Sequence, residues 1–516
     1  MYPGIHAKSA PDRPAVIMAG SGETMTYGDL DERSSRLARV LHDAGLRRGD
    51  VLALLAENTI RYLEVYWAAM RSGLYLVAIN RHLAPTEVAH IVSDSDARAM
   101  VASAGLRELA EATVPLTPKI AHRYAFGGAV AGHESYEAAV AGAGEPLAEQ
   151  PRGSTMLYSS GTTGLPKGVK NPIPGVPVDH PAADMIVPLV KGVFGIGPDD
   201  AYLSPGPLYH AAPLRWAGAV HAVGGTVVVM EKFDAEQALV AIERYRVTTA
   251  QFVPTMFVRM LKLPEQTRTR YDVSSLRMAV HAAAPCPVDV KQRMIDWWGP
   301  VIREYYSATE ANGITIIDSS KWLAKPGSVG QAALGVIHIC DDFGKELPTG
   351  EVGLVYFERD QVAFEYHNDP EKTRAAQHPE HRLWTTVGDV GYVDEEGYLF
   401  LTDRKAFMII SGGVNIYPQE VENVLTLHSK VYDVAVIGVP DDEMGEQVKA
   451  VVQPAEGVSG SPEFAAELIA YVRDRIAHYK APRSVDFVAE LPRTPTGKLL
   501  KNKVREPYLA GSGVAG

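Results

Sequence analysis

The sequence predicts an α/β protein with a large N-terminal domain of stacked sheets and helices and a small, mobile C-terminal α+β domain. Three features predict this: a length of 516 residues, alternating helix and strand patterns through most of the chain, and a change of pattern near residue 400. A chain of this length exceeds one ordinary domain and fits two or three.

The N-terminal part alternates amphipathic helices with short apolar runs. Thr26 and Asp29 are spaced as a capping box, and the apolar residues behind them recur at helical spacing until Gly45 ends the pattern. The elements expected next are a helix over 65–73 and strands over 51–57, 74–80, 224–230, 247–254 and 276–285. Alternation of this kind favours largely parallel sheets.

The pattern changes close to residue 400. Residues 397–410 are expected to form a hairpin with a charged turn. The elements expected after it are strands over 433–439, 447–453 and 484–490 and a helix within 462–479. We therefore place a domain boundary at 402–406, which separates a large domain of residues 1–402 from a small domain of residues 403–516.

Composition limits the classes of function. Hydrophobic residues make up 46% and charged residues 22%, as in globular proteins, and the net charge of -12 argues against a broad basic surface for nucleic acid. The two cysteines, Cys286 and Cys340, are not spaced as a metal or redox pair, which favours a cytoplasmic location. The start does not resemble a signal peptide, and no transmembrane segment is expected.

The stretch SSGTTGLPKG at 159–168 is the first candidate for a binding site. Its glycines let successive N–H groups point inward, and its hydroxyls and Lys167 add donors and positive charge suited to phosphate oxygens. A P-loop needs G-x-x-x-x-G-K-[ST], but here Pro166 stands before the lysine and Gly168 follows it. Taken alone, the stretch fits either a phosphate-binding loop or a flexible surface loop.

Seven segments in order along nearly the whole chain resemble the signature blocks of adenylate-forming enzymes. This superfamily includes acyl- and aryl-CoA synthetases, peptide-synthetase adenylation domains and luciferases. The segments are YSSGTTGLPKGV (158–169), PLYHAAP (207–213), HAAAPC (281–286), YYSATE (305–310), TVGDVGYVDEEGYLFLTDR (386–404), IISGGVNIYPQEVE (409–422) and PRTPTGKLLK (492–501). One such block is weak evidence, whereas seven in order are specific.

The resemblance implies a two-step reaction. A carboxylate attacks the α-phosphate of ATP to form a mixed anhydride and pyrophosphate, and a thiol then displaces AMP. Because the first step brings two anionic groups together, catalysis depends on positioning and charge neutralisation. The implied co-substrates are ATP and CoA, and the implied metal is Mg²⁺.

The resemblance also implies which residues bind ATP or AMP. The residues implied at the β- and γ-phosphates are Ser159, Ser160, Gly161, Thr162, Thr163, Gly164 and Lys167. Tyr306, beside Ser307, would stack on adenine opposite the backbone of Ala282, Ala283 and Ala284. The remaining contacts would be Thr309 to the α-phosphate, Asp389 to both ribose hydroxyls, and Arg404 to ribose or phosphate. Glu310 would help to hold Mg²⁺, although without the flanking motif a solvated carboxylate or a helix cap is the better interpretation.

Lys498 and His210 complete the implied catalytic set. Lys498 would bridge the substrate carboxylate and the α-phosphate during adenylation, although a lone lysine in such a loop is usually a surface charge. The small domain would then rotate at a hinge around Asp403 and Ala406, so that Ser411, Gly412 and Gly413 line the path of the CoA thiol. His210 would stand where this path meets the acyl pocket.

The acyl pocket is expected to draw on 205–216, 252–258 and 280–284. The candidate side chains are Trp216, Phe252, Met256, Phe257 and His281. This set is apolar and has no obvious amine-binding aspartate, so it favours a hydrophobic carboxylic acid over an amino acid. We expect a medium- to long-chain fatty acid, with aryl and polycyclic (steroid-type) acids left open.

The sequence departs from the family pattern at three places. Ser307 replaces the usual glycine of the Y-G-x-T-E block, and His281 and Ala282 replace Ser–Gly or Gly–Gly. The pivot position, usually Asp or Lys, is Ala406 and is followed by Phe407. These departures leave the energetics of domain rotation and the shape of the acyl pocket open.

Taken together, these segments lead us to interpret the sequence as that of an AMP-forming acyl-CoA synthetase. One alternative is a ligase that transfers its acyl group to a carrier protein, and another is a nucleotide-binding homologue without catalysis. A homodimer is a candidate assembly state. A P-loop ATPase is excluded by the spacing of residues 159–168.

Overall fold

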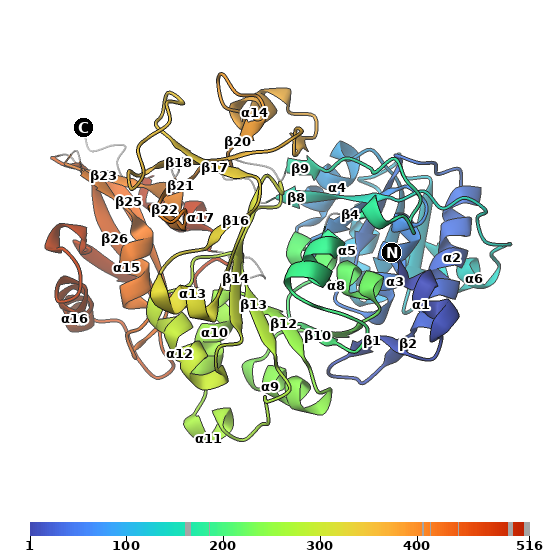
Figure 1. Cartoon of the computed structure of the whole chain (residues 1–516), viewed down its shortest axis with the longest axis horizontal. Helices are drawn as coiled ribbons and strands as arrows, with labels where there is room; N and C mark the ends of the chain where they lie inside the picture. Colours follow the sequence, from blue (N-terminus) through green and yellow to red (C-terminus); the bar gives the residue numbers. More distant parts are fainter. Residues whose placement is uncertain are drawn as a thin grey trace.

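The computed structural model describes residues 1–159, 167–184, 186–404, 407–412, 414–441, 443–493 and 499–509, and only the backbone of Ser159, Asp403 and Arg404 (Figure 1). Within these residues the chain forms four β-sheets with helices packed against them. Three sheets lie in the part before residue 405, and the fourth belongs to the C-terminal part.

The largest sheet has nine strands in the order β16-β15-β14-β13-β12-β10-β11-β1-β2. The run from β14 to β1 is parallel, and β2, β15 and β16 are antiparallel. The strands are β1 (Pro14–Met18), β2 (Thr24–Thr26), β10 (Ala201–Ser204), β11 (Thr226–Val229), β12 (Thr249–Phe252), β13 (Met278–His281), β14 (Ile302–Tyr306), β15 (Ile314–Asp318) and β16 (Gln331–Leu334).

The second sheet has eight strands in the order β19-β9-β8-β4-β3-β5-β6-β7. It is parallel from β8 to β7, and β9 and β19 extend it in antiparallel fashion. The strands are β3 (Val51–Leu55), β4 (Tyr75–Ile79), β5 (Ala97–Ser103), β6 (His122–Phe126), β7 (Glu134–Ser135), β8 (Ser154–Ser159), β9 (Lys167–Lys170) and β19 (Glu365–Tyr366). The expectation of largely parallel sheets is therefore confirmed.

Helices connect and cover these strands. They are α1 (Pro3–Ser9), α2 (Tyr27–Asp43), α3 (Ile60–Met70), α4 (Pro85–Asp94), α5 (Arg107–Thr113), α6 (Tyr136–Ala141), α7 (Ile186–Pro188), α8 (Ala211–Val223), α9 (Ala235–Arg244), α10 (Pro254–Leu261), α11 (Glu265–Arg268), α12 (Val288–Trp298), α13 (Ser319–Ala324) and α14 (Pro370–Ala375). The capping box at Thr26 and Asp29 opens α2, as the sequence predicts. The helix expected over 65–73 begins earlier, at Ile60.

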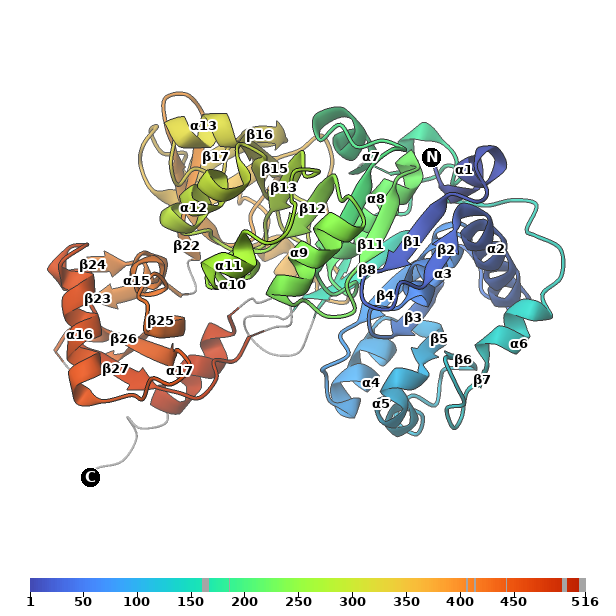
Figure 2. The same cartoon turned by 90° about the horizontal axis from the view of Figure 1, so that it is seen from below.

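Two apolar cores lie on opposite faces of the nine-stranded sheet. On one face, α3 and α8 pack between the two large sheets, and a single cluster joins Leu54 of β3, Trp67 of α3 and Val227 of β11 (Figure 2). On the other face, α9, α10 and α12 cover a second cluster that includes Phe252 and Phe257. Because side chains alternate along a strand, neighbouring strand residues belong to different cores.

A buried histidine ties the first core together. Trp67 Nε1 donates to His221 Nδ1 at 3.1 Å, and His221 Nε2 lies 2.9 Å from the carbonyl oxygen of Ala15. The indole can only donate, so Nδ1 accepts and Nε2 carries the proton. Burial lowers the pKa of His221 to about 4, which keeps the ring neutral. One neutral imidazole therefore links α3, α8 and β1.

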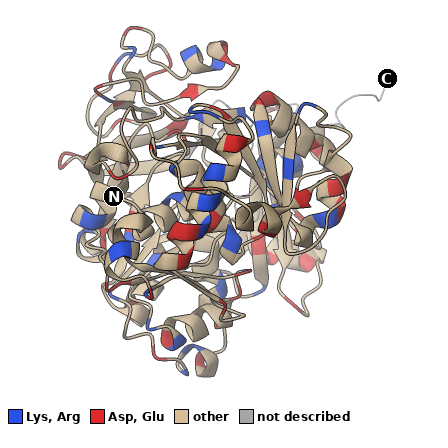
Figure 3. Cartoon of the chain, turned by 90° about the vertical axis from the view of Figure 1, so that its right-hand side faces the viewer, with Lys and Arg blue, Asp and Glu red and all other residues tan. Residues whose placement is uncertain are grey.

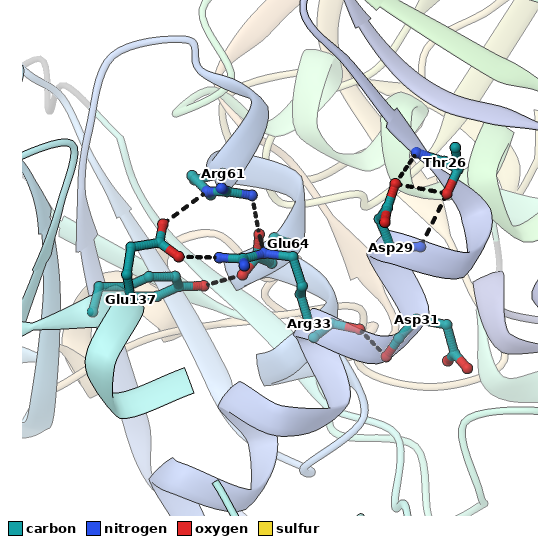
Figure 4. A network of polar contacts seen from close by, with 9 residues as sticks. Thr26, Asp29, Asp31, Arg33, Arg61, Glu64 and Glu137 are labelled. Carbon is teal, nitrogen blue, oxygen red and sulfur yellow. Dashed lines mark hydrogen bonds and ion pairs between the residues drawn. The ribbon is translucent and has the colours of Figure 1, made fainter. Parts of the chain in front are cut away.

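A charged network joins α2, α3 and α6 (Figure 4). The fully buried carboxylate of Glu64 accepts from Arg33 at 2.9 Å, from Arg61 at 3.0 Å and from the Tyr136 hydroxyl at 2.6 Å. Both arginines also pair with the half-exposed Glu137. The buried charge of Glu64 is thus fully compensated, as burial of a carboxylate requires.

The third sheet contains β17 (Val336–Cys340), β18 (Gly353–Glu358), β20 (Trp384–Thr385), β21 (Asp389–Val393) and β22 (Leu399–Arg404). The hairpin expected over 397–410 is wrong. Strand β22 pairs with β21, whereas β23 (Ile409–Ser411) pairs with β24 (Val414–Ile416) and β26 (Gly445–Pro454) in another sheet. Two apolar runs around a charged turn match a hairpin locally, but here they belong to different sheets.

The C-terminal part is the α+β unit that the sequence predicts. Strands β25 (Val431–Asp441) and β26 (Gly445–Pro454) form a long antiparallel pair, and β27 (Ser484–Phe487) pairs with β26 in parallel. The helices of this unit are α15 (Pro418–Leu425), α16 (Pro462–Arg473) and α17 (Lys501–Leu509). Lys262, at the end of α10, donates to the carbonyl oxygens of Val431 and Tyr432 at 2.9 and 3.1 Å, which links this unit to the preceding part.

Charged residues of both signs are interspersed over the elements (Figure 3), in keeping with the moderate net charge of -12. Among the described residues, no helix combines the length and apolar character that crossing a membrane requires.

Candidate active site

The candidate nucleotide site lies where β13 and β14 end. These strands are parallel neighbours, with His281 opposite Glu304, so the segments that follow them leave the sheet side by side. Ala282, Ala283 and Ala284 follow β13, and Tyr306 closes β14. The carboxyl ends of parallel strands are where α/β sheets bind ligands, because the connecting segments diverge there.

Tyr306 contacts a carboxylate from a different sheet. Its hydroxyl donates to Asp389 Oδ2 at 2.6 Å, and Asp389, at the start of β21, is buried. The structure thus brings together the residue expected at adenine and the residue expected at ribose. Ala283 has a φ of +74°, a left-handed conformation that costs free energy in a non-glycine residue.

Glu310 lies in the same region and is held by a tyrosine. The Tyr366 hydroxyl donates to Glu310 Oε1 at 2.8 Å, and the Glu310 side chain is buried. Tyr366 belongs to β19, which pairs with β9 at the end of the 159–168 stretch. Ala311, next to Glu310, has a φ of +53°, so the backbone is in the left-handed region here as well.

Lys372 lies near this carboxylate, and Lys167 lies near Lys372. Lys167 forms an ion pair with Asp369, and the Lys372 ammonium lies 4.2 Å from the centre of the Tyr366 ring. Burial and the neighbouring Lys167 lower the pKa of Lys372. Since Asp369 pairs with Lys167, the two ammonium groups stand with two carboxylates, and both lysines carry the donors that bind phosphate oxygens.

Buried groups fix the segment from Ser307 to Thr309. The Ser307 hydroxyl donates to the carbonyl oxygen of Gly313 at 2.8 Å, and a Cβ at Gly313 would lie 1.9 Å from the Phe357 ring. Arg215 of α8 donates to the Thr309 carbonyl oxygen at 3.4 Å and to the Thr155 hydroxyl at 3.3 Å. Arg215 thereby connects α8, β8 and the turn that carries Thr309.

His210 lies at the N-terminus of α8, and its ring packs on Tyr209 with ring centroids 4.4 Å apart. The segment before it is held by Asn58. The Asn58 amide donates to the carbonyl oxygens of Gly206 and Met230 at 3.0 and 2.8 Å and accepts from the Leu208 amide at 2.8 Å. Three hydrogen bonds to one buried side chain fix where α8 begins.

The five residues expected in the acyl pocket do not form one wall. Trp216 belongs to the core between the two large sheets, whereas Phe252, Met256 and Phe257 belong to the core on the other face. His281 is fully buried beside Phe257, and the centroids of these two rings are 5.5 Å apart. Burial lowers the pKa of His281 well below its ordinary value. The five side chains therefore lie on both faces of the nine-stranded sheet, because Trp216 belongs to α8 whereas Met256 and Phe257 belong to α10 on the opposite face.

The residues expected to bind CoA lie in the C-terminal part. Ser411 is buried at the end of β23, and Gly412 has a φ of +58° and donates its N–H to the Met444 carbonyl oxygen at 2.8 Å. A Cβ at Gly412 would lie 2.4 Å from the Met444 methyl group. Glycine is therefore suited to this turn both by conformation and by space.

Several expected residues cannot be placed. Ser160, Gly161, Thr162, Thr163, Gly164, Ala406, Gly413 and Lys498 lie outside the described residues, and Ser159, Asp403 and Arg404 are described by their backbone only. The domain boundary at 402–406 and the hinge stay predictions.

Sequence reasoning missed several residues that the fold brings to this region. They are Asn58, Arg215, Gln251, Tyr305, Tyr366, Asp369 and Lys372. Only the YHNDPEKT stretch at 366–373 carries a usable signal, because it gathers polar and charged residues after an apolar run. Arg215, Gln251 and Tyr305 lie within α8, β12 and β14, which read as core, and Asn58 lies in the connection between β3 and α3.

Glu310 has the donor chemistry that Mg²⁺ prefers, a carboxylate oxygen. Among the described residues, no group of three or more His, Cys, Asp or Glu side chains could hold a metal ion by itself. Mg²⁺ is commonly held by one or two carboxylates together with substrate phosphates, so Glu310 beside a triphosphate fits this ion.

Comparisons with known proteins agree with the fold. The family model described as AMP-binding enzyme matches residues 5–367, and the AMP-binding enzyme C-terminal domain matches residues 420–498. Feruloyl-CoA synthase from an Amycolatopsis species is 34% identical over 511 residues, which cover 98% of each chain. The long-chain-fatty-acid–CoA ligase FadD13 of Mycobacterium tuberculosis is 32% identical over 515 residues, which cover 98% of this chain and 97% of its own.

A solved structure agrees over the same extent. The anthranilate CoA ligase AuaEII in complex with anthranoyl-AMP matches with a TM-score of 0.83 and 25% identity, covering 99% of this chain and 98% of that chain. Fold and site therefore define an adenylate-forming enzyme. Within that class, the chain belongs to the acyl-CoA synthetase superfamily, whose members are CoA synthetases and ligases.

Proposed function

We propose that this enzyme converts a hydrophobic carboxylic acid, ATP and CoA into an acyl-CoA thioester, AMP and pyrophosphate through an acyl-AMP intermediate. One observation carries the proposal. The Tyr306–Asp389 hydrogen bond, the Tyr366–Glu310 hydrogen bond and the Lys167–Asp369 ion pair gather around the segments that follow β13 and β14. These groups have the chemistry that adenine and ribose, a metal–triphosphate and pyrophosphate require.

In the first step the acid's carboxylate oxygen forms a bond to the α-phosphorus, and the bond to the β-phosphate oxygen breaks. Asp389 would accept hydrogen bonds from ribose, and Tyr306 would contact adenine. Lys167 and Lys372 would neutralise the charge that collects on the leaving pyrophosphate. Positioning and neutralisation of this kind carry most of the catalysis in phosphoryl-type transfers.

Bound Mg²⁺ would neutralise phosphate charge next to Glu310. The Tyr366 hydrogen bond fixes the orientation of that carboxylate, so its second oxygen is directed consistently. This arrangement supports a role for Tyr366 as a positioning residue.

We propose that Lys498 acts in adenylation and that the C-terminal part then reorients about residues 403–406. The thiol would reach the acyl-AMP past Ser411, Gly412 and Gly413, with His210 at the junction. The thiol sulfur forms a bond to the acyl carbon, AMP departs with the electron pair, and the thiol proton goes to solvent or base. Domain motion of this kind gates many enzymes.

The half-reactions test this assignment. Lys498→Ala is expected to abolish acyl-AMP formation, which is measured by pyrophosphate release and by hydroxylamine trapping. Thioester formation from preformed acyl-AMP is expected to be largely retained. Lys503→Ala, in α17, is the matched control for a nearby lysine. Equal loss in both half-reactions after Lys498→Ala would reject the role.

The same assays separate the alternatives. Pyrophosphate release without a CoA thioester would favour transfer to a carrier protein, and a relative from Streptomyces coeruleorubidus is a fatty acid–acyl-carrier-protein ligase. Absence of trapped acyl-AMP with all acids would favour a nucleotide-binding homologue without catalysis. The sequence favours a fatty acid substrate. The side chains around Trp216, on the face of the nine-stranded sheet that α8 covers, support a more compact acid.

A further inference from the structure

A stack of aromatic rings lies next to the candidate nucleotide site. Trp216 of α8 stacks on Tyr202 of β10, with ring centroids 6.0 Å apart and planes 18° apart. Its other neighbour is Tyr305 of β14, at 5.9 Å and 22°. Phe194 adds a tilted ring at 4.9 Å from Trp216. The three near-parallel rings form one stacked array, with Trp216 in the middle.

Gln251 of β12 locks this array in place. Its amide Nε2 donates to the Tyr305 oxygen at 2.6 Å, and its Oε1 accepts from the Tyr202 hydroxyl at 3.3 Å. The amide thus ties the two outer rings to one strand of the nine-stranded sheet. Hydrogen bonds between buried polar side chains restrict rotamers, so Tyr305 is held rather than free to swing aside.

Tyr305 is the member of the array nearest the reacting groups. It directly precedes Tyr306, and its stacking partner Trp216 directly follows Arg215 in α8, which contacts the Thr309 carbonyl oxygen. Tyr305 is partly exposed, whereas Tyr202, Trp216 and Gln251 behind it are buried. Of this array, Tyr305 is therefore the side chain open to a ligand that lies beside Thr309.

From this geometry, and resting on the proposed function, we infer that Tyr305, held by Gln251, closes the acyl pocket and selects short, planar aromatic acids over long-chain fatty acids. A flat, rigid ring presents a stacking surface to an aromatic ring. It also blocks the depth that an extended alkyl chain needs. Phe252 and Phe257, on the far face of the sheet, leave this selection unchanged.

The phenol of Tyr305 adds a second element of selection. Its oxygen accepts from Gln251, which leaves its O–H to donate, and no described residue accepts that hydrogen. Burial raises the pKa of Tyr305 to about 12, so the group stays protonated at neutral pH. An oxygen substituent on the acid's ring supplies the missing acceptor. The acid class is therefore a benzoate- or cinnamate-sized ring that bears a hydroxyl or methoxy group.

The first experiment measures kcat/KM for pyrophosphate release with benzoate, 4-hydroxybenzoate, 4-hydroxycinnamate, octanoate and hexadecanoate. The aromatic acids are expected to exceed hexadecanoate by at least about tenfold. Tyr305→Ala is expected to reverse this order by opening depth for the alkyl chain. Tyr305→Phe keeps the aromatic preference and loses the preference for hydroxylated over plain rings. A hexadecanoate preference in the wild-type enzyme overturns the inference while leaving the proposed function intact.

Phe257→Leu is the matched control on the opposite face, and the ranking of acids is expected to stay as in the wild type. A ranking that changes with Phe257→Leu and not with Tyr305→Ala overturns the inference. Calorimetry with acyl-sulfamoyl adenosines that carry the same acyl groups measures the affinity of the pocket for each acyl group without turnover. If no acid is turned over, the proposed function fails. Tighter binding of the aromatic analogues then still supports the pocket, and tighter binding of the hexadecanoyl analogue rejects it.

Discussion

At the scale of single residues, Asp389 carries the clearest expectation. Its buried carboxylate already accepts one hydrogen bond, from Tyr306, and the proposed role adds the ribose hydroxyls. Asp389→Asn removes the charge but keeps the shape. Since hydrogen bonds to a charged group contribute about 1.5–3 kcal/mol, KM for ATP is expected to rise about 10- to 100-fold. Steady-state kinetics with a thermal melt as the folding control checks this, and an unchanged KM rejects the ribose contact.

Lys372 is a second residue with a separable effect. It forms no ion pair with a carboxylate among the described residues, while Lys167 next to it is paired with Asp369. Lys372→Met is expected to weaken ATP binding and inhibition by pyrophosphate together, each by several-fold, because one phosphate-neutralising charge is lost. Lys170→Met is the control, since Lys170 lies on β9, the strand that also contains Lys167, and its ammonium lies over the Tyr75 ring. Pyrophosphate inhibition curves distinguish this from a general loss of activity.

At the scale of elements, the Glu64 network decides how α2, α3 and α6 stay together. Glu64→Gln removes the charge that compensates Arg33 and Arg61 inside the network. Breaking a buried pair in this way is expected to lower the free energy of unfolding by about 3 kcal/mol. Glu137→Gln, at a half-exposed partner, is expected to cost below about 1 kcal/mol. Urea denaturation of both variants provides the comparison, and equal effects would contradict it.

The elements also mark the reach of sequence reasoning. Helix α2 with its capping box, the parallel strands and the C-terminal α+β unit follow from local periodicity and caps, because these signals act within a few residues. The hairpin predicted over 397–410 is wrong because strand pairing depends on contacts far apart in the sequence. Strand β22 pairs with β21, and β23 pairs with β24 and β26. The acyl-pocket candidates lie on two faces of the nine-stranded sheet, since motif position does not reveal which face α8 or α10 covers.

At the scale of the whole molecule, His221 couples stability to pH. Its folded pKa of about 4 lies below the ordinary value of 6.5, so between these values the unfolded chain binds a proton that the folded chain excludes. The free energy of unfolding is therefore expected to fall as the pH drops from about 6.5 to 4, by about 3 kcal/mol from this group. The nearby His6 lowers this pKa further in the same direction.

Urea denaturation at pH 7, 6 and 5 measures this slope. His221→Asn removes the titrating ring. The free energy of unfolding of this variant is expected to be lower than that of the wild type at pH 7, but to change less with pH between 7 and 5. A variant with the full wild-type slope would show that other groups, among them the buried His281, account for the acid sensitivity.

The position of β1 has a consequence for how the chain is made. Val16 pairs with Val227 of β11, although most of the intervening residues build the other large sheet. On the ribosome, the first strand emerges long before its parallel partner is synthesised, and only the short hairpin with β2 is available to it. Hairpins alone are marginal in water, and unpaired strand edges promote aggregation. A fragment meant to contain only the eight-stranded sheet should therefore begin after residue 26, and chaperone dependence during translation should concentrate before residue 226 has emerged.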